Sequence, residues 1–478
     1  MTVDLKTSWC ARWAFERGLA AIYLVAFLVA VNQFVPLVGQ HGLLPAARFV
    51  EQVPMRLSPS VFFWFPSDAA FLACAWLGVT LSLLALSGVP ERVGAMPAAA
   101  VWASLYVLYL SFINVGQTFY SFAWESLLVE LGFFTIFAGD RATPPHRFLN
   151  LIYRWTLFRL MFGAGLIKLR GDACWSDFTC LDVFFETQPM PNPLSWYMHQ
   201  LQRSVLHGGV WVNHFVELIV PFAYFLPQPF ASVAGIVTIL FQLMLIAGGN
   251  LSWLNWLTVV LAFTAIDDRL LSWLPVTLPT RQPIPRFQQI ATGGLAIMVV
   301  LLSIAPVMNM LSPGQVMNTS FNPLQIVNTY GAFGSVSKER NEIILEGTDA
   351  DNPTEATWWR AYEFRGKPGD PTRMAPQIAP YHLRIDWLMW FAAMSSPSDY
   401  PWFPELLLKL LQGDAAAASL LRSNPFPGRP PVWIRAELYR YRFTTPEERA
   451  RTGAWWHRER IGPYFPAVRL QPGAAPAR

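Results

Sequence analysis

The sequence predicts a polytopic α-helical membrane protein with about nine spans, followed by a soluble, strand-rich α+β C-terminal domain. Hydrophobic residues make up 53% of the 478 residues and charged residues only 14%, which is too apolar for a soluble globular protein. Apolar runs near the ~20 residues that cross a bilayer recur before Leu311. After Leu311 charged and turn-forming residues become frequent, and no apolar run of spanning length follows.

The first predicted domain covers residues 1–311 and contains all the candidate spans. They lie near residues 19–38, 68–88, 97–114, 124–139, 149–169, 210–227, 230–247, 250–266 and 288–310. Between the fifth and sixth candidates lies a polar loop, residues 170–209, which holds two of the four cysteines. Because this loop interrupts an otherwise apolar domain, we expect it to carry structure of its own.

Basic residues in the short loops predict the orientation. They gather on one side of the nine spans, at Arg12, Arg17, Arg92 and Arg141 among others. The positive-inside rule places that side in the cytoplasm, so the polar loop and the C-terminal domain lie outside. The net charge of +4 is small and spread along the chain, so we expect no nucleic acid as a partner, whereas the apolar composition predicts that the lipid bilayer is one.

The second predicted domain covers residues 312–466 and is followed by a disordered tail, residues 467–478. Strands are expected at residues 342–346, 362–365 and 432–443, which alternate in polarity or carry β-branched and aromatic residues. Helices are expected at residues 384–394 and 404–421, the second broken near Gly413. About 160 residues suffice to bury a core of their own.

Cys174 and Cys180 are six residues apart in the polar loop. An oxidising compartment outside the cytoplasm allows them to form a disulfide. Free or redox-active thiols are the alternative, and a metal site is the third. We expect no metal there, because no histidine or third cysteine lies nearby at the spacing of a zinc site.

Ionisable residues inside apolar segments are the second functional signal, because they are costly in a membrane unless paired or functional. They are Glu125, Glu130, Arg159, Lys168, His214 and Glu217. One interpretation is ion pairs between helices, with Lys168 reaching the outer boundary. The other is a polar cavity below the outer loop, in which a desolvated Lys168 acts as a base beside His214 and Glu217.

Seven stretches carry a resemblance to a known family. They are INVGQTFYSFAWESLLVELGF (113–133), FRLMFGAGLIKLRGDACWSDFTCLDVFFETQPMPNPLSWYMHQL (158–201), WVNHFVELIVPF (211–222), GGNLSWLNWLT (248–258), VNTYGAFGSVSKERNEIILEG (327–347), YEFRGKPGDPTRMAPQIAPYHLRIDWLMWFAA (362–393) and NPFPGRPPVWIRAELYRYRFT (424–444). In these stretches the chain resembles the lipase maturation factor family. The resemblance runs from about residue 60 to residue 466.

The resemblance implies a folding factor for dimeric lipases such as lipoprotein lipase, with no enzymatic activity and no cofactor. In animals the family resides in the endoplasmic reticulum membrane, and its conserved C-terminal domain, here residues 312–466, faces the lumen and contacts the client. Exposed aromatic side chains are the candidate client contacts, and packing in the core is the alternative for each. The candidates are Trp358, Trp359, Trp387, Trp390 and Trp433.

The likeness to the animal proteins leaves the compartment open. The chain ends in GAAPAR, without a retrieval signal, and its use of arginine over lysine and of alanine indicates a bacterial member. For a bacterium we expect a multi-pass inner-membrane protein with a periplasmic C-terminal domain. For a eukaryote we expect the endoplasmic reticulum membrane with a lumenal domain.

A second resemblance covers only a few residues. AGLIKL (164–169), followed by Asp172 and Trp175, is similar to a lysine-containing segment of the vitamin K-dependent γ-carboxylase and its bacterial membrane relatives. There a lysine is a proposed base. The alternative function is therefore a membrane enzyme with a polar site around Lys168, acting on a lipid- or quinone-like cofactor or a protein substrate. A redox partner using Cys174 and Cys180 is a third hypothesis.

Overall fold

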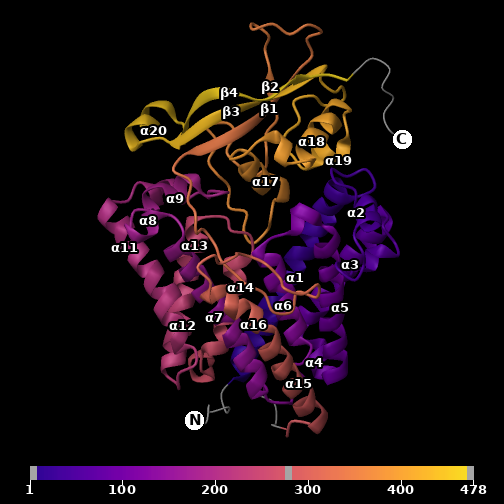
Figure 1. Cartoon of the computed structure of the whole chain (residues 1–478), viewed down its shortest axis with the longest axis vertical. Coiled ribbons are helices and arrows are strands. Elements are labelled where there is room, and N and C mark those ends of the chain that lie inside the picture. The colour runs from indigo at the N-terminus through magenta and orange to yellow at the C-terminus, as the bar shows by residue number, and fades with distance from the viewer. Residues whose placement is uncertain (1–7, 275–281, 471–478) are drawn as a thin grey trace.

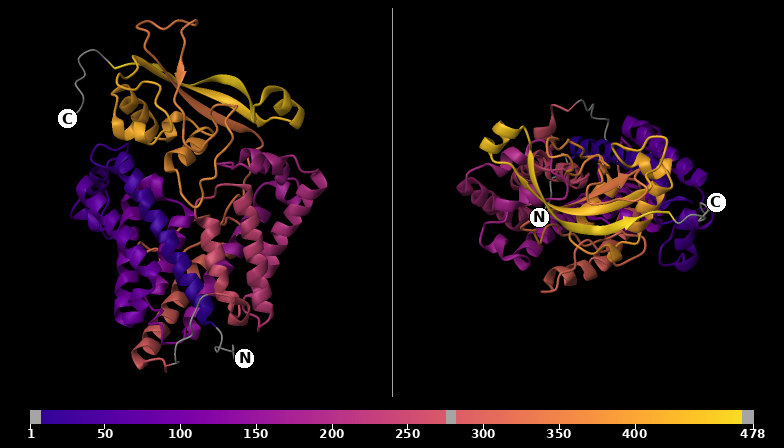
Figure 2. Two further views of the ribbon diagram at one scale, coloured as in Figure 1. Left: turned by 180° about the vertical axis from the view of Figure 1, so that it is seen from behind. Right: turned by 90° about the horizontal axis from the view of Figure 1, so that it is seen from above.

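The computed structural model describes residues 8–274 and 282–470. Helices form a bundle, and a four-stranded sheet covers one end of it (Figure 1). The N-terminal helix begins at the opposite end of the bundle (Figures 1 and 2). We call these two ends the sheet end and the N-terminal end.

Six helical segments among the described residues are long and apolar enough to cross a membrane. They are Trp9–Val38 (α1), Asp68–Ser87 (α3), Ala95–Val115 (α5), Arg203–Ala223, Phe230–Gly248 (α13) and Arg286–Leu311. The fourth consists of Arg203–His214 (α11), the π-helical turn Phe215–Ile219 (η3) and Val220–Ala223 (α12), and the last of Arg286–Leu302 (α15) and Ile304–Leu311 (α16). Large apolar side chains on several of them, such as Leu83, Leu240 and Ile297, are exposed, as lipid-facing side chains are.

The prediction of nine spans is wrong, because three of the predicted segments are too short or too polar to qualify. Ala123–Thr135 (α6) has 13 residues and is therefore only about 20 Å long. Leu254–Ala262 (α14), with its extension Phe263–Ala265 (η4), is similarly short. Arg147–Arg170 (α7) is long enough, but it carries five basic residues.

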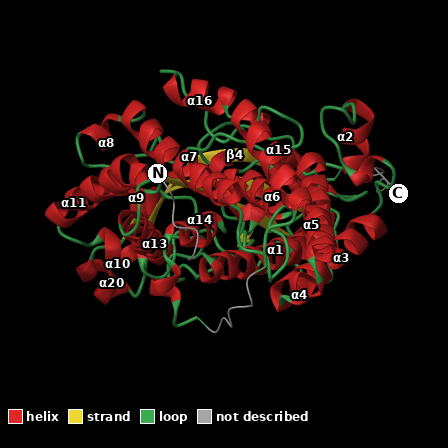
Figure 3. Ribbon diagram, turned by 90° about the horizontal axis from the view of Figure 1, so that it is seen from below, coloured by secondary structure: helices red, strands yellow, loops and turns green. Residues whose placement is uncertain are grey.

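The three rejected segments lie in the middle of the bundle (Figure 3). Every residue of α6 except Phe133 is buried. A helix that is surrounded by protein is as apolar as one that faces lipid, so hydropathy alone does not separate the two. Surrounding protein also explains why α7 tolerates charges, since the neighbouring helices can supply their partners.

Short helices and turns connect the long ones. They are Ala46–Gln52 (α2), Val61–Phe63 (η1), Val89–Val93 (α4), Gln117–Tyr120 (η2) and Asp268–Leu271 (η5). The polar loop after α7 forms Ala173–Ser176 (α8), Leu181–Thr187 (α9) and Ser195–His199 (α10). A disulfide joins Cys174 to Cys180, which confirms that prediction.

The polar loop supports the sheet. The indole N–H of Trp196 donates to the carbonyl of Thr444 at 2.9 Å, and the guanidinium of Arg340 donates to the carbonyl of Pro189 at 3.1 Å. The backbone N–H of Phe443 donates to the carboxylate of Glu186 at 2.6 Å. The loop is therefore a platform for the C-terminal region.

The C-terminal region is a small antiparallel sheet with four helices. Its strands are Arg340–Thr348 (β1), Arg360–Ala361 (β2), Trp433–Phe443 (β3) and Trp456–Val468 (β4), in the order β2-β1-β3-β4. Its helices are Arg384–Ala392 (α17), Trp402–Leu411 (α18), Ala415–Ser419 (α19) and Pro446–Thr452 (α20), with a 3-10 turn at Pro397–Asp399 (η6). Helix α17 lies between the sheet and the bundle (Figure 1).

Several expected elements of this region are present. One expected strand is absent, one strand was not expected, and the expected start of the tail falls inside a strand. Two predicted strands correspond to β1 and β3, and the helix break occurs at Gly413, whose φ is +71°. Residues 362–365 do not form the expected strand. The sequence does not predict β4, because this edge strand is mostly exposed and contains prolines and charges. The expected disordered tail starts inside β4, and residues 471–478 lie outside the described part.

The first residues after the last span do not leave the bundle. Val327, Asn328 and Tyr330 are buried, although they follow the predicted boundary at residue 311. The hydroxyl of Tyr106 in α5 donates to the carbonyl of Leu324 at 2.9 Å. The segment between α16 and β1 is thus threaded back among the helices, because its polar groups find partners there.

Candidate functional site

A buried polar cluster surrounds Lys168 near the end of α7. Its ammonium donates to both carboxylate oxygens of Glu217, at 2.6 and 2.7 Å, and to the side-chain oxygen of Asn213 at 2.9 Å. The amide of Asn213 donates in turn to Glu217 at 3.0 Å. All three N–H groups of the lysine are therefore used, and Lys168 does not reach the outer boundary as one interpretation expected.

Local backbone features bring Lys168 and Glu217 together. A Cβ on Gly165 in α7 would come within 2.6 Å of Leu218, so only glycine lets the two helices approach this closely. Glu217 lies in the π-helical turn η3. Pro221 explains that turn, because proline lacks an N–H and its ring clashes with the carbonyl four residues before it, which is that of Glu217.

Trp175 and the disulfide cover the cluster from the outside. Trp175 lies between the two disulfide-bonded cysteines in the sequence. The ammonium of Lys168 lies 5.0 Å from the centroid of its ring. The Nε2 atom of His214 lies 3.0 Å from the carbonyl oxygen of Trp175, so His214 holds this loop, and it forms no hydrogen bond or ion pair with Glu217 in the described part of the chain. The structure therefore does not assemble His214, Lys168 and Glu217 into one acid–base group.

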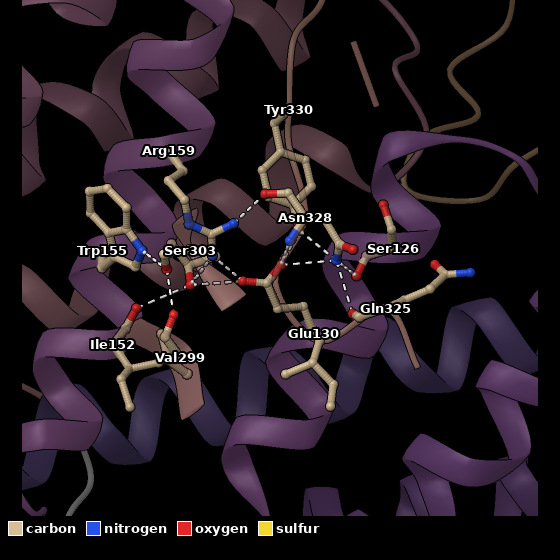
Figure 4. Close-up of polar contacts among 12 residues, drawn as sticks. Ser126, Glu130, Ile152, Trp155, Arg159, Val299, Ser303, Gln325, Asn328 and Tyr330 are labelled. Carbon is tan, nitrogen blue, oxygen red and sulfur yellow. Dashed lines mark hydrogen bonds and ion pairs between the residues drawn. The ribbon is translucent and has the colours of Figure 1, made fainter. Parts of the chain in front are cut away.

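Glu130 and Arg159 form a second buried network deeper in the bundle (Figure 4). Arg159 pairs with Glu130 and donates to the carbonyl of Asn328. Glu130 also accepts from the amide of Asn328 at 2.9 Å, the hydroxyl of Tyr330 at 2.8 Å and the hydroxyl of Thr156 at 3.1 Å. This network anchors the threaded segment after α16 to α6 and α7.

Glu125 joins the bundle to the C-terminal region. Its carboxylate pairs with the guanidinium of Arg384 in α17 at 2.7 Å and accepts from the hydroxyl of Tyr109 at 2.5 Å. His382 lies beside this pair, with both ring nitrogens unpartnered among the described residues. Burial, reinforced by Arg384, holds the pKa of His382 well below its ordinary value, so the ring is neutral. The two regions are thus locked together by buried contacts.

The five candidate client-binding tryptophans differ in accessibility. Trp358 is 80% exposed, in the loop between β1 and β2. Trp387 is buried, and Trp390 donates to the carbonyl of Thr187 at 2.9 Å. Trp359 stacks under the guanidinium of Arg435 at 4.1 Å, and Trp433 donates to the carbonyl of Asp351 at 3.0 Å. Of the five, Trp358 is the large apolar side chain that points freely into solvent.

Comparison with known proteins gives matches along most of the chain. A model of the lipase maturation factor transmembrane domain matches residues 10–273, and a model of the C-terminal domain matches residues 326–466. Lipase maturation factor 1 of mouse is 44% identical over 97% of this chain and 88% of its own length. The human protein is 44% identical over 97% and 89%, and chicken lipase maturation factor 2 is 29% identical over 96% and 81%.

The chain belongs to the lipase maturation factor family. No solved structure shows a significant match to it. The family assignment supports a maturation role, as the sequence predicted, in a multi-pass membrane protein. The alternative of an enzyme acting at Lys168 has no support in these comparisons, and the contacts of Lys168 with Glu217 and Asn213 account for all three N–H groups of its ammonium.

Sequence reasoning missed the neutral and distant partners of this lipase maturation factor's buried charges. The missed residues are Asn213, Asn328, Tyr330 and Arg384. Asn213 precedes Glu217 by four residues, a helical spacing that could have indicated the pair. Arg384 lies 259 residues after Glu125, and no local pattern could have connected them.

Proposed function

We propose that this protein promotes the folding and assembly of exported lipases from its position in the membrane. The observation that carries this proposal is the 44% identity to mouse and human lipase maturation factor 1 over 97% of the chain. Those names refer to lipases, and the match includes both the helical and the C-terminal regions. A client of the same class is therefore the first one to test.

The distribution of charge supports an orientation with the sheet end outside the cytoplasm. Arg12, Arg17, Arg92 and Arg141 line one cavity of about 180 Å³ at the N-terminal end. The positive-inside rule favours the cytoplasm for that end. The disulfide lies toward the sheet end, where an oxidising compartment would preserve it. In a bacterium that compartment is the periplasm, and in a eukaryote it is the lumen of the endoplasmic reticulum.

Two features make the sheet the candidate client surface. The loop with Trp358 projects beyond the sheet, so this side chain can meet a partner without any rearrangement (Figure 1). Strand β4 pairs with β3 on one side only and is an edge strand of 13 residues. An edge of this kind can add an extended segment of a partly folded client through backbone hydrogen bonds. Trp387 and Trp390 instead support the packing beneath the sheet.

Deletion of the gene in its native host tests the proposal. We expect one or more exported lipases or esterases to lose activity, while their transcripts persist and the wild-type gene restores them. Trp358→Ala should restore less activity at equal protein level. Trp64→Ala is the matched control, because Trp64 is 62% exposed but lies outside the C-terminal region. An exported proteome with unchanged lipase and esterase activity would overturn the proposal.

A further inference from the structure

Two neighbouring cavities lie between the Lys168 cluster and the boundary of the bundle with the C-terminal region. The inner cavity, of about 80 Å³, is lined by Lys168 and Glu217 at its polar end. The outer cavity, of about 310 Å³, extends to Trp387 and Trp390 of α17. Both cavities are lined by Leu254 and other shared residues, so no more than one layer of side chains separates them.

The inner cavity contains a polar group that lacks a partner. Asn255 is only 3% exposed and lines this cavity, and its Nδ2 atom has no hydrogen-bond partner in the described part of the chain. Gln242 lines the same cavity, and within the described residues its amide donates a hydrogen bond only to the sulfur of Met161, at 3.4 Å. A buried donor without an acceptor is unfavourable, so Asn255 is poised for an acceptor brought by a ligand.

The charge of the site selects an uncharged ligand. Lys168 and Glu217 neutralise each other, and every N–H of the ammonium is already used. A carboxylate or phosphate would have to separate this pair and leave the Glu217 charge buried without compensation. Among the described residues, no charged side chain lines the outer cavity, whose walls are mostly aromatic and aliphatic. Its volume is at the lower end of the roughly 300–1,000 Å³ typical of ligand pockets.

The outer cavity also provides a route from the surface. Met317, Ser335 and Met394 line it and are exposed. A flexible chain can therefore enter between the bundle and α17 and reach Leu254 at the wall of the inner cavity. Methionines on such a route adapt easily to a ligand, because their side chains are unbranched and polarizable.

We propose that the two cavities together bind one uncharged lipid. Its chain lies in the outer cavity against Trp387 and Trp390, and its carbonyl or hydroxyl oxygen accepts a hydrogen bond from Asn255. The ligand contacts the bundle and the C-terminal region at the same time. It therefore adds apolar contact between the two regions, independently of which client the protein serves.

Photolabelling tests this proposal on the full-length protein in phosphatidylcholine nanodiscs. The probe is 1-monooleoylglycerol with a diazirine in its chain, and mass spectrometry locates the label. We expect labelled peptides that contain Leu254 or Phe333. Unlabelled monooleoylglycerol should compete, whereas oleate and oleoyl lysophosphatidylglycerol should not. Label only on lipid-facing helices, or equal competition by the charged lipids, would overturn the proposal.

Substitutions in the cavities separate lipid binding from folding. Ala332 lines both cavities, so Ala332→Phe should abolish most of the specific label. If Ala332→Phe does not fold, Leu254→Phe is used in its place, because Leu254 also lines both cavities. Ala296→Phe is the control, because this half-buried alanine of α15 lines neither cavity. Asn255→Leu should weaken competition by monooleoylglycerol about fivefold without lowering the unfolding temperature. Unchanged competition in Asn255→Leu would show that Asn255 does not bind the lipid.

Discussion

The pairs Arg159–Glu130 and Lys168–Glu217 are both buried and both involve α7, but their surroundings differ. Arg159 and Glu130 are fully enclosed, and Asn328, Tyr330 and Thr156 also donate to or accept from them. Lys168 and Glu217 line a cavity together with an unpartnered amide. The first pair holds a chain segment in place, whereas the second forms the wall of a space that can receive a ligand.

An ionisable residue in an apolar segment is therefore not by itself evidence of catalysis. Both pairs look the same in the sequence, because each places a charged residue in a segment where apolar residues are expected. What separates them is whether the protein fills all the space around the charges. An enclosed pair acts through stability, and its loss leaves a charge with no solvent to compensate it.

The largest expected effect is at the enclosed pair. Glu130→Gln should lower the free energy of unfolding by about 3–5 kcal/mol, because Arg159 stays buried without its counter-charge. Denaturant unfolding in detergent, followed by far-UV circular dichroism, measures this change. A loss below about 1 kcal/mol would mean that solvent reaches Arg159, and the contrast between the two pairs would then fail.

The same substitution in the Lys168–Glu217 pair, which lines a cavity, should lower the free energy of unfolding by less. Glu217→Gln is expected to lower the free energy of unfolding by about 1.5–3 kcal/mol, because Lys168 keeps Asn213 and water can enter the cavity. The double variant Lys168→Met/Glu217→Leu should recover most of this loss, since no charge is then left unpaired. Lipase maturation per folded molecule should be retained. If Glu130→Gln and Glu217→Gln lower the free energy of unfolding equally, the enclosed pair and the cavity pair do not differ in stability.

Removal of the disulfide should affect the two pairs differently. Trp175, which lies between the two cysteines in the sequence, covers the Lys168–Glu217 pair and not the Arg159–Glu130 pair. Replacing Cys174 and Cys180 with serine opens a short loop and should cost about 2 kcal/mol. We expect greater hydrogen exchange in α8 and α9 and no change around Arg159. Maturation per folded molecule should be unchanged. Its loss at normal stability would favour the redox hypothesis for these cysteines.

The effect that is smallest near neutral pH concerns His382 beside the third buried pair, Glu125–Arg384. Burial lowers the pKa of His382 below 6.5, so below that pH the unfolded chain binds a proton that the folded protein excludes. Stability should therefore fall with decreasing pH below about 6.5, by up to about 1.4 kcal/mol per pH unit. His382→Phe should be less sensitive to pH, as thermal unfolding between pH 7 and pH 5 would reveal. Identical pH profiles would contradict this expectation.

Local patterns were sufficient for part of the fold and of the candidate site. Composition predicted the membrane region, spacing and compartment predicted the Cys174–Cys180 disulfide, and alternation predicted β1 and β3. The ionisable residues were found as outliers in apolar runs. Each of these inferences depends on residues that are close together in the chain.

Long-range packing accounts for the failures. The sequence could not distinguish α6 and α14 from membrane spans, because burial in protein and exposure to lipid select the same residues. It could not place Asn328 and Tyr330 beside Glu130, since about 200 residues separate them in the chain. It also missed β4, whose pairing with β3 rather than its own composition makes it a strand.

The class of the protein, its family and the chemical identity of its buried charges follow from the sequence alone, because hydropathy and motif order are properties of the chain. The tertiary structure sets which charge meets which partner and which apolar helices are buried inside the protein. It also decided where space remains, at Asn255 and along α17. Partners and cavities depend on packing between distant segments, and that packing is a property of the fold as a whole.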